Sequence, residues 1–552
     1  MEEDNEDSEE EEGQKLPRVH NKERLWLNVQ PKGFGKSVPD FHEEPLKPIP
    51  DECQTAYDFY KLFMPDEFVD ELVRVSRLYA VKKGNSDLQA KITNNSLRTT
   101  QAIMYLTGYL TPSNRLMFWE QKPDTGNMFV KKAMSRNLFM ELIRNTYFTD
   151  RLVPSKPEDA DYDRHWKVRP LIEHINSMAR KHVRISEHVS IDEGMIKYFG
   201  PHPLKQFIRG KPIRFGYKMW ILANSTGELL WVQPYAGSST HIEDFGLGQG
   251  PNVVMGLAQQ CGLPPGTKVY VDNLFTSLDL IDHMGAKGYG VTGTLRQNRI
   301  IGIPLPNKKQ ANKELKRGET KMVFTQDAVV SVWKDNQPVY MASNCANGEL
   351  TSTCKRYSRV DRGYVNFTQP NMNNQYNKHM GGVDMLDARV KNYAISIRVR
   401  KWYWCFYTWF LGVQMVQAWR HYRAHMKEQH KHVQVDEETK EEMKKRKAAE
   451  RKIENIPLLD FTRQVVELTV MKHSDTYDMA IPQREVVTSV SKVAKEEIRL
   501  DEGNHLIMVT ELRGVCRKCK NRTTFRCARC DVALHPTCFY YYHRPQEEPE
   551  KE

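Results

Sequence analysis

The chain has 552 residues, which is more than a single hydrophobic core accommodates, so its length excludes one small domain and predicts two to four domains. A hydrophobic content of 39% supports globular domains and excludes a wholly disordered chain. The formal net charge of +11 understates how basic the body is, because nine of residues 2–12 and four of the last six are Asp or Glu. This balance modestly favours a polyanion such as nucleic acid as partner, over a cationic surface with no single partner.

Two stretches bear on targeting and membranes. Residues 1–50 are acidic and then rich in Pro and Lys, which predicts a disordered tail, and no apolar run follows the first Met, so we expect no signal peptide. The uncharged stretch Trp402–Trp419 has the length of a membrane helix. Because it contains Gln414, Gln417 and six Trp or Tyr residues, we predict a buried core helix and no membrane partner.

The remaining chain divides by periodicity and composition. Residues 55–180 repeat apolar side chains near helical spacing and predict an all-α dimerisation or DNA-binding domain, with neither role favoured. Residues 185–300 carry short β-rich runs around a helix and predict the first part of an α/β core. We expect a β-rich insertion at 300–370, the helical last part of the core at 371–430, and a charged linker with helical stretches at 431–504.

Three acidic residues organise the core. Asp192 lies in the run Ser-Ile-Asp-Glu, Asp272 lies in Val-Tyr-Val-Asp-Asn, and Asp384 follows Gly-Gly-Val. A strand that stops on an Asp delivers a carboxylate to the edge of a sheet, where it can meet another. Carboxylates brought together repel one another unless a hard divalent cation lies between them. The residues therefore predict a magnesium site, and the basic body suggests chemistry on phosphodiesters.

The C-terminal residues 505–545 carry ligands with metal-site spacing. Soft ligands two residues apart suit tetrahedral zinc, and disulfides are a poor alternative in an intracellular chain. Three interleaved pairs predict a cross-brace in which pairs one and three hold one ion and pair two holds another with His543, while a single four-Cys site stays open. The proposed ligands are Cys516, Cys519, Cys527, Cys530, His535, Cys538 and His543, with His505 as a possible eighth.

Several long motifs in one order then resemble the piggyBac transposase family from about residue 55 to 545. They are Ser190-Ile-Asp-Glu-x-Met195, Lys205-Gln-Phe-x2-Gly-Lys-Pro-Ile-Arg-x-Gly-x-Lys-x-Trp220, Val271-Asp-Asn-x-Phe-Thr-Ser277 and Asn377-Lys-x-Met-Gly-Gly-Val-Asp-x2-Asp387. The resemblance implies an RNase H-like α/β catalytic core with a β-rich insertion domain, an all-α N-terminal domain and a small C-terminal cross-brace zinc finger.

The resemblance also implies a reaction. It is metal-dependent cut-and-paste cleavage and strand transfer at TTAA sites through hairpin intermediates, with transposon terminal repeats as DNA partner, by a homodimer in the nucleus. Asp192, Asp272 and Asp384 would hold Mg²⁺ or Mn²⁺, with Asp387 as an accessory carboxylate. Two ions about 3.5–4 Å apart would be bridged by Asp192. Phosphate contacts would come from Lys205, Arg209, Lys211, Arg214 and Lys218.

Two features keep other functions open. After Asp192 the family usually carries basic residues where this chain has Phe199-Gly200-Pro201, which could weaken the grip on DNA. A domesticated DNA- or chromatin-binding protein without transposition is therefore an alternative, and a cross-brace protein of the ubiquitin or histone-tail type is a weaker one. The run Lys444–Lys447 could be a nuclear import signal or a solvated helix face.

Overall fold

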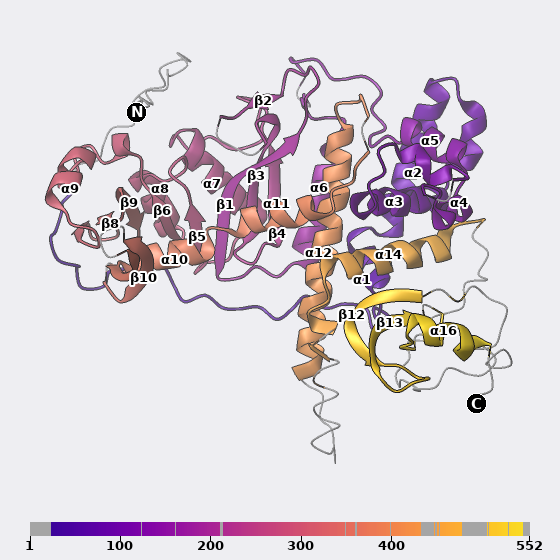
Figure 1. Ribbon diagram of the computed structural model, residues 1–552. Coiled ribbons are helices and arrows are strands. Elements are labelled where there is room, and N and C mark those ends of the chain that lie inside the picture. Colours follow the sequence, from indigo (N-terminus) through magenta and orange to yellow (C-terminus); the bar gives the residue numbers. More distant parts are fainter. Residues whose placement is uncertain are drawn as a thin grey trace, which may run out of the picture. The chain divides into compact units, whose positions relative to one another are not determined.

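The computed structural model forms two compact units, Met1–Tyr477 and Asp478–Glu552 (Figure 1). It describes residues 24–431 except 123, 160–161, 210–212, 348, 359–361 and 398, then 447, 450–451, 453–476, and 505–544 except 506, 528 and 531. The first acidic residues, Lys211 and most of the run Lys444–Lys447 therefore lie outside the described residues.

The first unit begins with a helical layer. Thr55 opens its first helix with a capping box, in which the Thr55 hydroxyl accepts from the N–H of Asp58 and the Asp58 carboxylate accepts from the N–H of Thr55. Thr93 and Ser96 form the same arrangement. The helices are α1 (Ala56–Phe63), α2 (Asp66–Lys82), α3 (Asn94–Tyr109), α4 (Met128–Ala133), α5 (Arg136–Asn145) and α6 (Arg169–His182), with 3-10 turns at Ser86–Lys91 and Arg115–Trp119.

A nine-stranded mixed sheet forms the centre of the first unit. Its order is β2-β3-β1-β5-β6-β9-β8-β7, and β4 also pairs with β3. The strands are β1 (His188–Lys197), β2 (Gln206–Phe207), β3 (Phe215–Asn224), β4 (Leu229–Pro234), β5 (Lys268–Val271), β6 (Gly290–Thr294), β7 (Thr320–Phe324), β8 (Val329–Lys334) and β9 (Pro338–Ser343). β1 pairs antiparallel with β3 and parallel with β5, and β6 runs parallel to β5. β1 is thus held on both sides by neighbouring strands.

Helices cover the sheet and complete the unit. They are α7 (Gln249–Cys261), α8 (Leu278–Ala286), α9 (Lys308–Glu314), α10 (Asn371–His379), α11 (Gly382–Asn392), α12 (Trp404–Lys431) and α14 (Leu458–His473), with a 3-10 turn at Gln297–Arg299. One apolar core joins the helical layer to the sheet. α12 carries the uncharged stretch Trp402–Trp419 into that core, where Phe406, Phe410 and Leu411 are buried. Among the described helices, none is both long and apolar enough to span a bilayer.

The N-terminal segment differs from the disordered tail that we expected over residues 1–50. From Arg24 onward it follows a defined path across the first unit. Leu27 exchanges two backbone hydrogen bonds of 2.8 Å with Phe324 on β7. The Arg24 guanidinium pairs with Asp279 at 3.0 Å and Asp282 at 2.8 Å on α8. The segment is rich in Pro and Lys but finds its partners far away in the sequence, so local composition could not predict its order.

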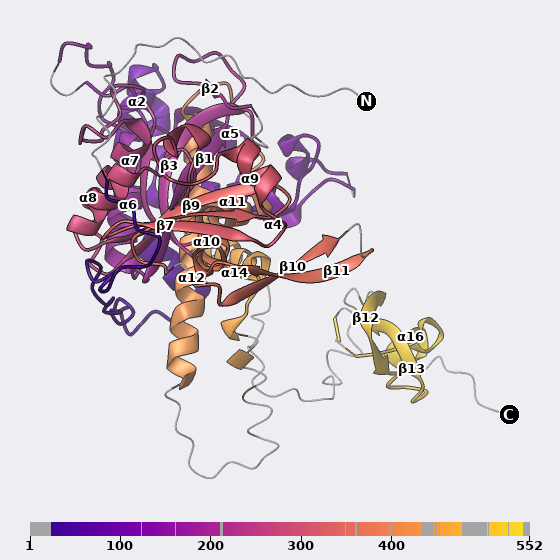
Figure 2. The same ribbon diagram turned by 90° about the vertical axis from the view of Figure 1, so that its left-hand side faces the viewer.

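The structure adds detail to two further expectations, the β-rich insertion at 300–370 and the charged linker with helical stretches at 431–504. Residues 300–370 are not a separate sheet, because β9 pairs with β6 and carries β8 and β7 into the main sheet. Only the hairpin of β10 (Ser352–Ser358) and β11 (Gly363–Gln369) stands apart, reaching out from the body of the unit (Figure 2). The expected charged linker also contains α14, whose Phe461, Val465 and Val470 are buried in the core.

The second unit is small and built around cysteines. It contains the hairpin of β12 (Ile507–Val515) and β13 (Arg522–Cys527), followed by α16 (Pro536–His543). Its buried centre consists of Cys516, Cys527, Val532 and Leu534. Two cysteines in so small a core leave little apolar surface to bury, which favours stabilisation by metal.

Candidate active site and metal centres

The sheet brings Asp192 and Asp272 together. The parallel pairing of β1 with β5 ends at Ile191 opposite Val271, so the two aspartates are the next residues on adjacent strands. Adjacent strands lie about 4.8 Å apart. Both carboxylates are partly exposed. A pair of acidic side chains at this spacing is suited to sharing a cation.

The loop after β5 fixes the position of Asp272. Its carboxylate Oδ1 accepts a hydrogen bond of 2.8 Å from the N–H of Leu274, and its carbonyl accepts one of 2.7 Å from the Thr276 hydroxyl. The Arg299 guanidinium donates to the carbonyl of Leu274 at 3.0 Å and to that of Thr276. No sequence pattern pointed to Arg299, which lies 27 positions beyond Asp272 and meets the loop only in the fold.

The third carboxylate comes from a helix. Asp384 lies exposed in the first turn of α11, where the helix dipole favours a negative charge. Gly382 allows this helix to approach the sheet, because a Cβ at that position would lie 2.3 Å from the carbonyl oxygen of Asn224 and 2.7 Å from Ser190 Oγ. The Gly-Gly sequence before Asp384 thus has a steric cause.

Tyr376 on α10 is a side chain whose pKa is affected by all three carboxylates. Burial, and then the negative charges of Asp272, Asp192 and Asp384, raise the pKa of Tyr376 to about 12. A phenol can respond to all three charges only when all three lie near it. The structure therefore brings the three predicted aspartates around one side chain. Tyr376 was not among the residues expected from the sequence, since nothing in its spacing marks it.

Asp387 lies at the margin of this group. One turn after Asp384, its Oδ1 lies 3.8 Å from where a Cβ of Gly194 would be, two residues along β1 from Asp192. Its Oδ2 pairs with Lys391 at 3.3 Å. Asp387 is thus close to the face of β1 that carries Asp192, as an accessory carboxylate should be.

The residues predicted to contact phosphates fall into two groups, those exposed on a hairpin and Lys218. β2 and the start of β3 form a hairpin on which Arg209 and Arg214 are exposed and Lys205 is partly exposed. Lys218 differs, because it lies opposite Met195 and therefore on the face of the sheet away from Asp192. It is paired with Glu193 at 2.5 Å and lies 3.9 Å from the ring centre of Trp220. The prediction of a phosphate contact for Lys218 is not supported by this position.

The Cys and His residues of the second unit form two groups. Within each group the ligand atoms lie within 4.8 Å of one another. In the first, Cys519 Sγ lies 3.2 Å from His535 Nδ1; in the second, Cys530 Sγ lies 3.4 Å from both His505 Nδ1 and His543 Nε2. Such separations suit corners of a tetrahedron with metal bonds of about 2.0–2.3 Å. The groups are Cys516, Cys519, His535 and Cys538, and His505, Cys527, Cys530 and His543.

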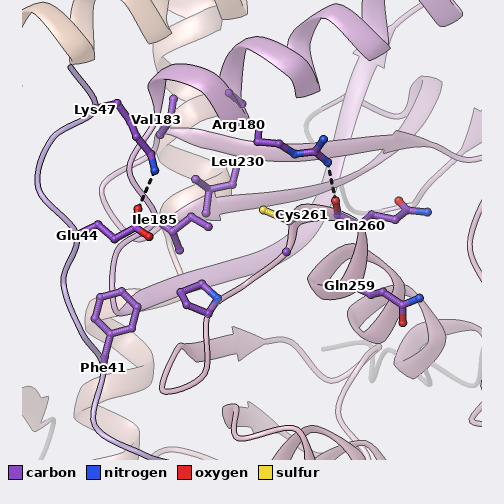
Figure 3. A pocket seen from close by; sticks show the side chains of 13 residues that line it. Phe41, Glu44, Lys47, Arg180, Val183, Ile185, Leu230, Gln259, Gln260 and Cys261 are labelled. Carbon is purple, nitrogen blue, oxygen red and sulfur yellow. Dashed lines mark hydrogen bonds and ion pairs between the residues drawn. The ribbon is translucent and has the colours of Figure 1, made fainter. Parts of the chain in front are cut away.

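A separate cavity of about 460 Å³ is lined by the N-terminal segment, α6 and the end of α7 (Figure 3). Glu44 pairs with Lys47 at 2.7 Å on one side, and Arg180 donates to the Gln260 carbonyl at 3.0 Å on the other. Cys261 also lines this cavity, and burial raises the pKa of its thiol to about 12. At neutral pH this thiol is protonated and a poor nucleophile, so the cavity adds nothing to the carboxylate site.

Comparison with known proteins finds relatives that cover most of this chain. A family model described as Transposase IS4 matches residues 55–419. Human PiggyBac transposable element-derived protein 3 is 32% identical over 497 residues, covering 89% of this chain and 76% of its own. Human PiggyBac transposable element-derived protein 2 is 29% identical over 549 residues, covering 98% and 85%.

A solved structure shares the fold. The cryo-EM structure of the piggyBac transposase synaptic complex with hairpin DNA matches with a TM-score of 0.60 at 19% identity, covering 90% of this chain and 100% of that chain. The sequence matches extend over the helical layer, the sheet and the three aspartates. The chain therefore belongs to the piggyBac family of transposases.

Proposed function

We propose that this protein cleaves and rejoins DNA at the carboxylates of Asp192, Asp272 and Asp384, with Asp387 as an accessory group. The observation that carries the proposal is their placement: Asp192 and Asp272 follow paired residues of adjacent strands, and the helix that carries Asp384 packs closely on the sheet at Gly382. Three carboxylates offer the oxygen donors that hard divalent cations prefer. Membership of a transposase family supports phosphodiester chemistry in general.

The chain's own residues hold the site in place. Asp192 is fixed on the central strand, Asp272 by the N–H of Leu274, and Asp384 at the N-terminus of α11. When bound, Mg²⁺ or Mn²⁺ supplies Lewis-acid chemistry that makes an attacking hydroxyl more acidic and neutralises charge on the leaving oxygen. The five strands β4-β3-β1-β5-β6, three antiparallel followed by two parallel, support an RNase H-like catalytic core.

The partner that we propose is DNA, namely transposon terminal repeats and a TTAA target, handled by a homodimer in the nucleus through hairpin intermediates. The neighbouring solved structure is a piggyBac synaptic complex with hairpin DNA, which supports this partner. The exposed Arg209 and Arg214 are suited to backbone phosphates, with Lys205 beside them. Lys211 stays a prediction, because it lies outside the described residues.

We propose that the second unit is a cross-brace zinc finger that reads the transposon ends. Each four-ligand group would hold one Zn²⁺, and ligand pairs one and three share the first ion. His505 is then the eighth ligand. Basic residues such as Arg517, Lys518 and Arg522 surround the ligands and favour DNA over a protein partner.

One observation favours the alternative of a domesticated DNA-binding protein that no longer transposes. Phe199, at 69% exposure, replaces a position where the family usually carries a basic residue after the first aspartate. An exposed phenylalanine gives no charge to a phosphate, so the substrate grip could be weaker while the carboxylates stay intact.

A plasmid excision assay in cells distinguishes the two functions. Cognate terminal repeats, found in the source genome, flank a reporter at TTAA, and the wild type is compared with Asp272→Ala. Precise TTAA repair that depends on Asp272 supports the transposase. Nuclear protein that binds these ends and yields no excision supports the binding factor.

A further inference from the structure

Three lysines from distant parts of the chain meet at the edge of the helical layer. Lys83 follows the last turn of α2, Lys167 precedes α6, and Lys401 precedes α12. Lys83 is exposed and the other two are half-buried. We call these three residues the lysine cluster.

Two tyrosine rings hold the lysine cluster together. The Nζ atoms of Lys83 and Lys401 lie 5.7 and 5.1 Å from the ring centre of Tyr79. Those of Lys401 and Lys167 lie 5.5 and 5.3 Å from the ring centre of Tyr403. Cation–π contacts of this kind orient an ammonium group without neutralising it. Lys401 also donates to the carbonyl of Arg144, which leaves its charge in place.

The cluster carries a charge that the protein does not balance. Over the described ranges, no carboxylate forms an ion pair with any of the three amines. Burial, and then the charges of Lys83 and Lys167, lower the pKa of Lys401 to about 8. Burial and the charges of Lys83 and Lys82 lower the pKa of Lys167 as well. Keeping cations together against their repulsion costs stability, which an anionic ligand would recover.

A cavity reaches from Lys401 of the lysine cluster to Asp387. It has a volume of about 840 Å³, and its lining includes both Asp387 and Lys401. Lys197, Lys391 and Arg400 add positive charge to its lining. Tyr198, Phe199, Trp404 and Trp409 supply aromatic surface. A cavity beside Asp387 that is lined by cations and aromatic rings is complementary to a nucleic-acid strand.

We propose that the lysine cluster binds backbone phosphates of the DNA strand that extends from the carboxylates through this cavity. The inference rests on the proposed function for the statement that the strand begins at the carboxylates. That the lysine cluster binds phosphates is a separate claim, which can be tested without cleavage. A phosphodiester is the ligand favoured here, because successive phosphates along one strand can engage amines that come from three elements. The lysine cluster is then a positioning site that holds DNA and takes no part in bond breaking.

The test is the salt dependence of DNA binding by the full-length, zinc-loaded protein. Lys83→Gln, Lys167→Gln and Lys401→Gln are combined in one variant, and generic duplex DNA and single-stranded DNA serve as probes. In a plot of log affinity against log salt concentration, the slope of the triple variant should be smaller in magnitude than that of the wild type by about two to three. The reason is that each phosphate contact contributes roughly 0.7–0.9 to the slope. At low salt the affinity should fall by at least about tenfold.

A matched variant controls for net charge. Lys47→Gln, Lys268→Gln and Lys321→Gln remove three lysines that each pair with a Glu, at 2.7, 2.6 and 2.7 Å. This control should leave the slope within about one of the wild type. The cluster variant should also keep or raise its melting temperature, because repulsion is relieved.

Three outcomes would decide the question. A lowered melting temperature with an unchanged slope in the cluster variant would show a structural role and overturn the proposal. Equal slopes in the cluster variant and the control would also overturn it. If the wild type never cleaves but the cluster variant loses slope, the phosphate site stands and the catalytic proposal fails.

Discussion

At the scale of single residues, Asp272 both accepts a hydrogen bond and carries a negative charge, and a conservative substitution separates these two roles. Its Oδ1 accepts from the N–H of Leu274, a bond that an Asn carbonyl can keep, while the negative charge is lost. We expect Asp272→Asn to fold normally and to lower the rate of strand cleavage by about 10³-fold or more, for a loss of roughly 4 kcal/mol of transition-state stabilisation.

The same variant has a readout that does not depend on cleavage. Without metal the three carboxylates repel one another, so Asp272→Asn should melt at the same or a higher temperature than the wild type, and added Mg²⁺ should raise that temperature less. Asp327→Asn, at an exposed turn, is the control and should behave as the wild type. An unchanged Mg²⁺ effect in Asp272→Asn would argue against metal at this site.

Gly382 allows a test of how Asp384 is positioned. A methyl group there would meet the Asn224 backbone at 2.3 Å, so α11 must shift and carry Asp384 away from the sheet. Gly382→Ala should destabilise the protein by about 1–3 kcal/mol and abolish excision. The neighbouring Gly381 has a φ of −75° and no atom within 4 Å of its added Cβ. Gly381→Ala should therefore retain both melting temperature and excision, and a loss equal to that of Gly382→Ala would contradict this steric explanation.

At the scale of elements, the second unit depends on its metal ligands. We expect two Zn²⁺ per chain by elemental analysis of purified protein. His505→Ala should reduce this to about one, because the group of His505, Cys527, Cys530 and His543 loses a ligand while the other group stays complete. His283→Ala, at an exposed helical position, should keep two. Two zinc ions in His505→Ala would remove His505 from the ligand set.

The N-terminal segment protects the edge of the sheet. β7 is the last strand of the sheet, and Leu27 pairs with its Phe324 through both backbone groups. Exposed edge strands invite pairing with other chains. Leu27→Pro removes the donated hydrogen bond, and we expect about 1 kcal/mol lower stability and more aggregation on mild heating, followed by light scattering. Val29→Pro, at an exposed residue two positions further on, should aggregate less than Leu27→Pro.

Local sequence patterns predicted helices and strands better than they predicted which other segments those elements contact. The runs Lys268–Val271 and Val329–Lys334 lie in regions predicted to be β-rich and form strands, because β-branched residues recur in them between turn residues. The three aspartates could be named because each has a distinctive local context. The pairing of β9 with β6, the path of residues 24–50 and the buried α14 could not, since they depend on contacts between distant segments.

The direction in which a side chain points was also not predictable from the sequence. Lys218 stands in a motif with other basic residues, but the register of β3 against β1 turns it toward Glu193. A shift of one residue in that register would reverse the face. Tyr376 and Arg299 were missed for the related reason that their roles come from position in space. The lysine cluster likewise joins residues 83, 167 and 401, which no spacing rule connects.

At the scale of the whole molecule, buried histidines make stability depend on pH. Burial lowers the pKa of His421 to about 3, that of His165 to about 3 and that of His174 to about 4. In the unfolded chain each titrates near 6.5, so below that pH the unfolded state binds protons that the folded state does not. Stability should therefore be highest near neutral pH and fall from about pH 6.5 toward pH 4.

Urea unfolding at half-unit steps of pH measures this loss. Each buried imidazole should cost up to about 1.4 kcal/mol per pH unit below its unfolded pKa. His421 packs against the rings of Phe59 and Phe63, so His421→Phe should flatten the curve below pH 6. The exposed His283→Ala should leave the slope unchanged. Equal slopes in all three proteins would mean that the titration of His421 does not control the transition.

The order of synthesis determines when the proposed carboxylate site can be complete. A ribosome that has released residues up to Ser343 has exposed every strand of the main sheet and two of the three carboxylates, while Asp384 has still to be made. Helix α11 must then return to the first strand, which was synthesised nearly 200 residues earlier. A translation product that ends before Asp384 therefore lacks the third carboxylate of the proposed site.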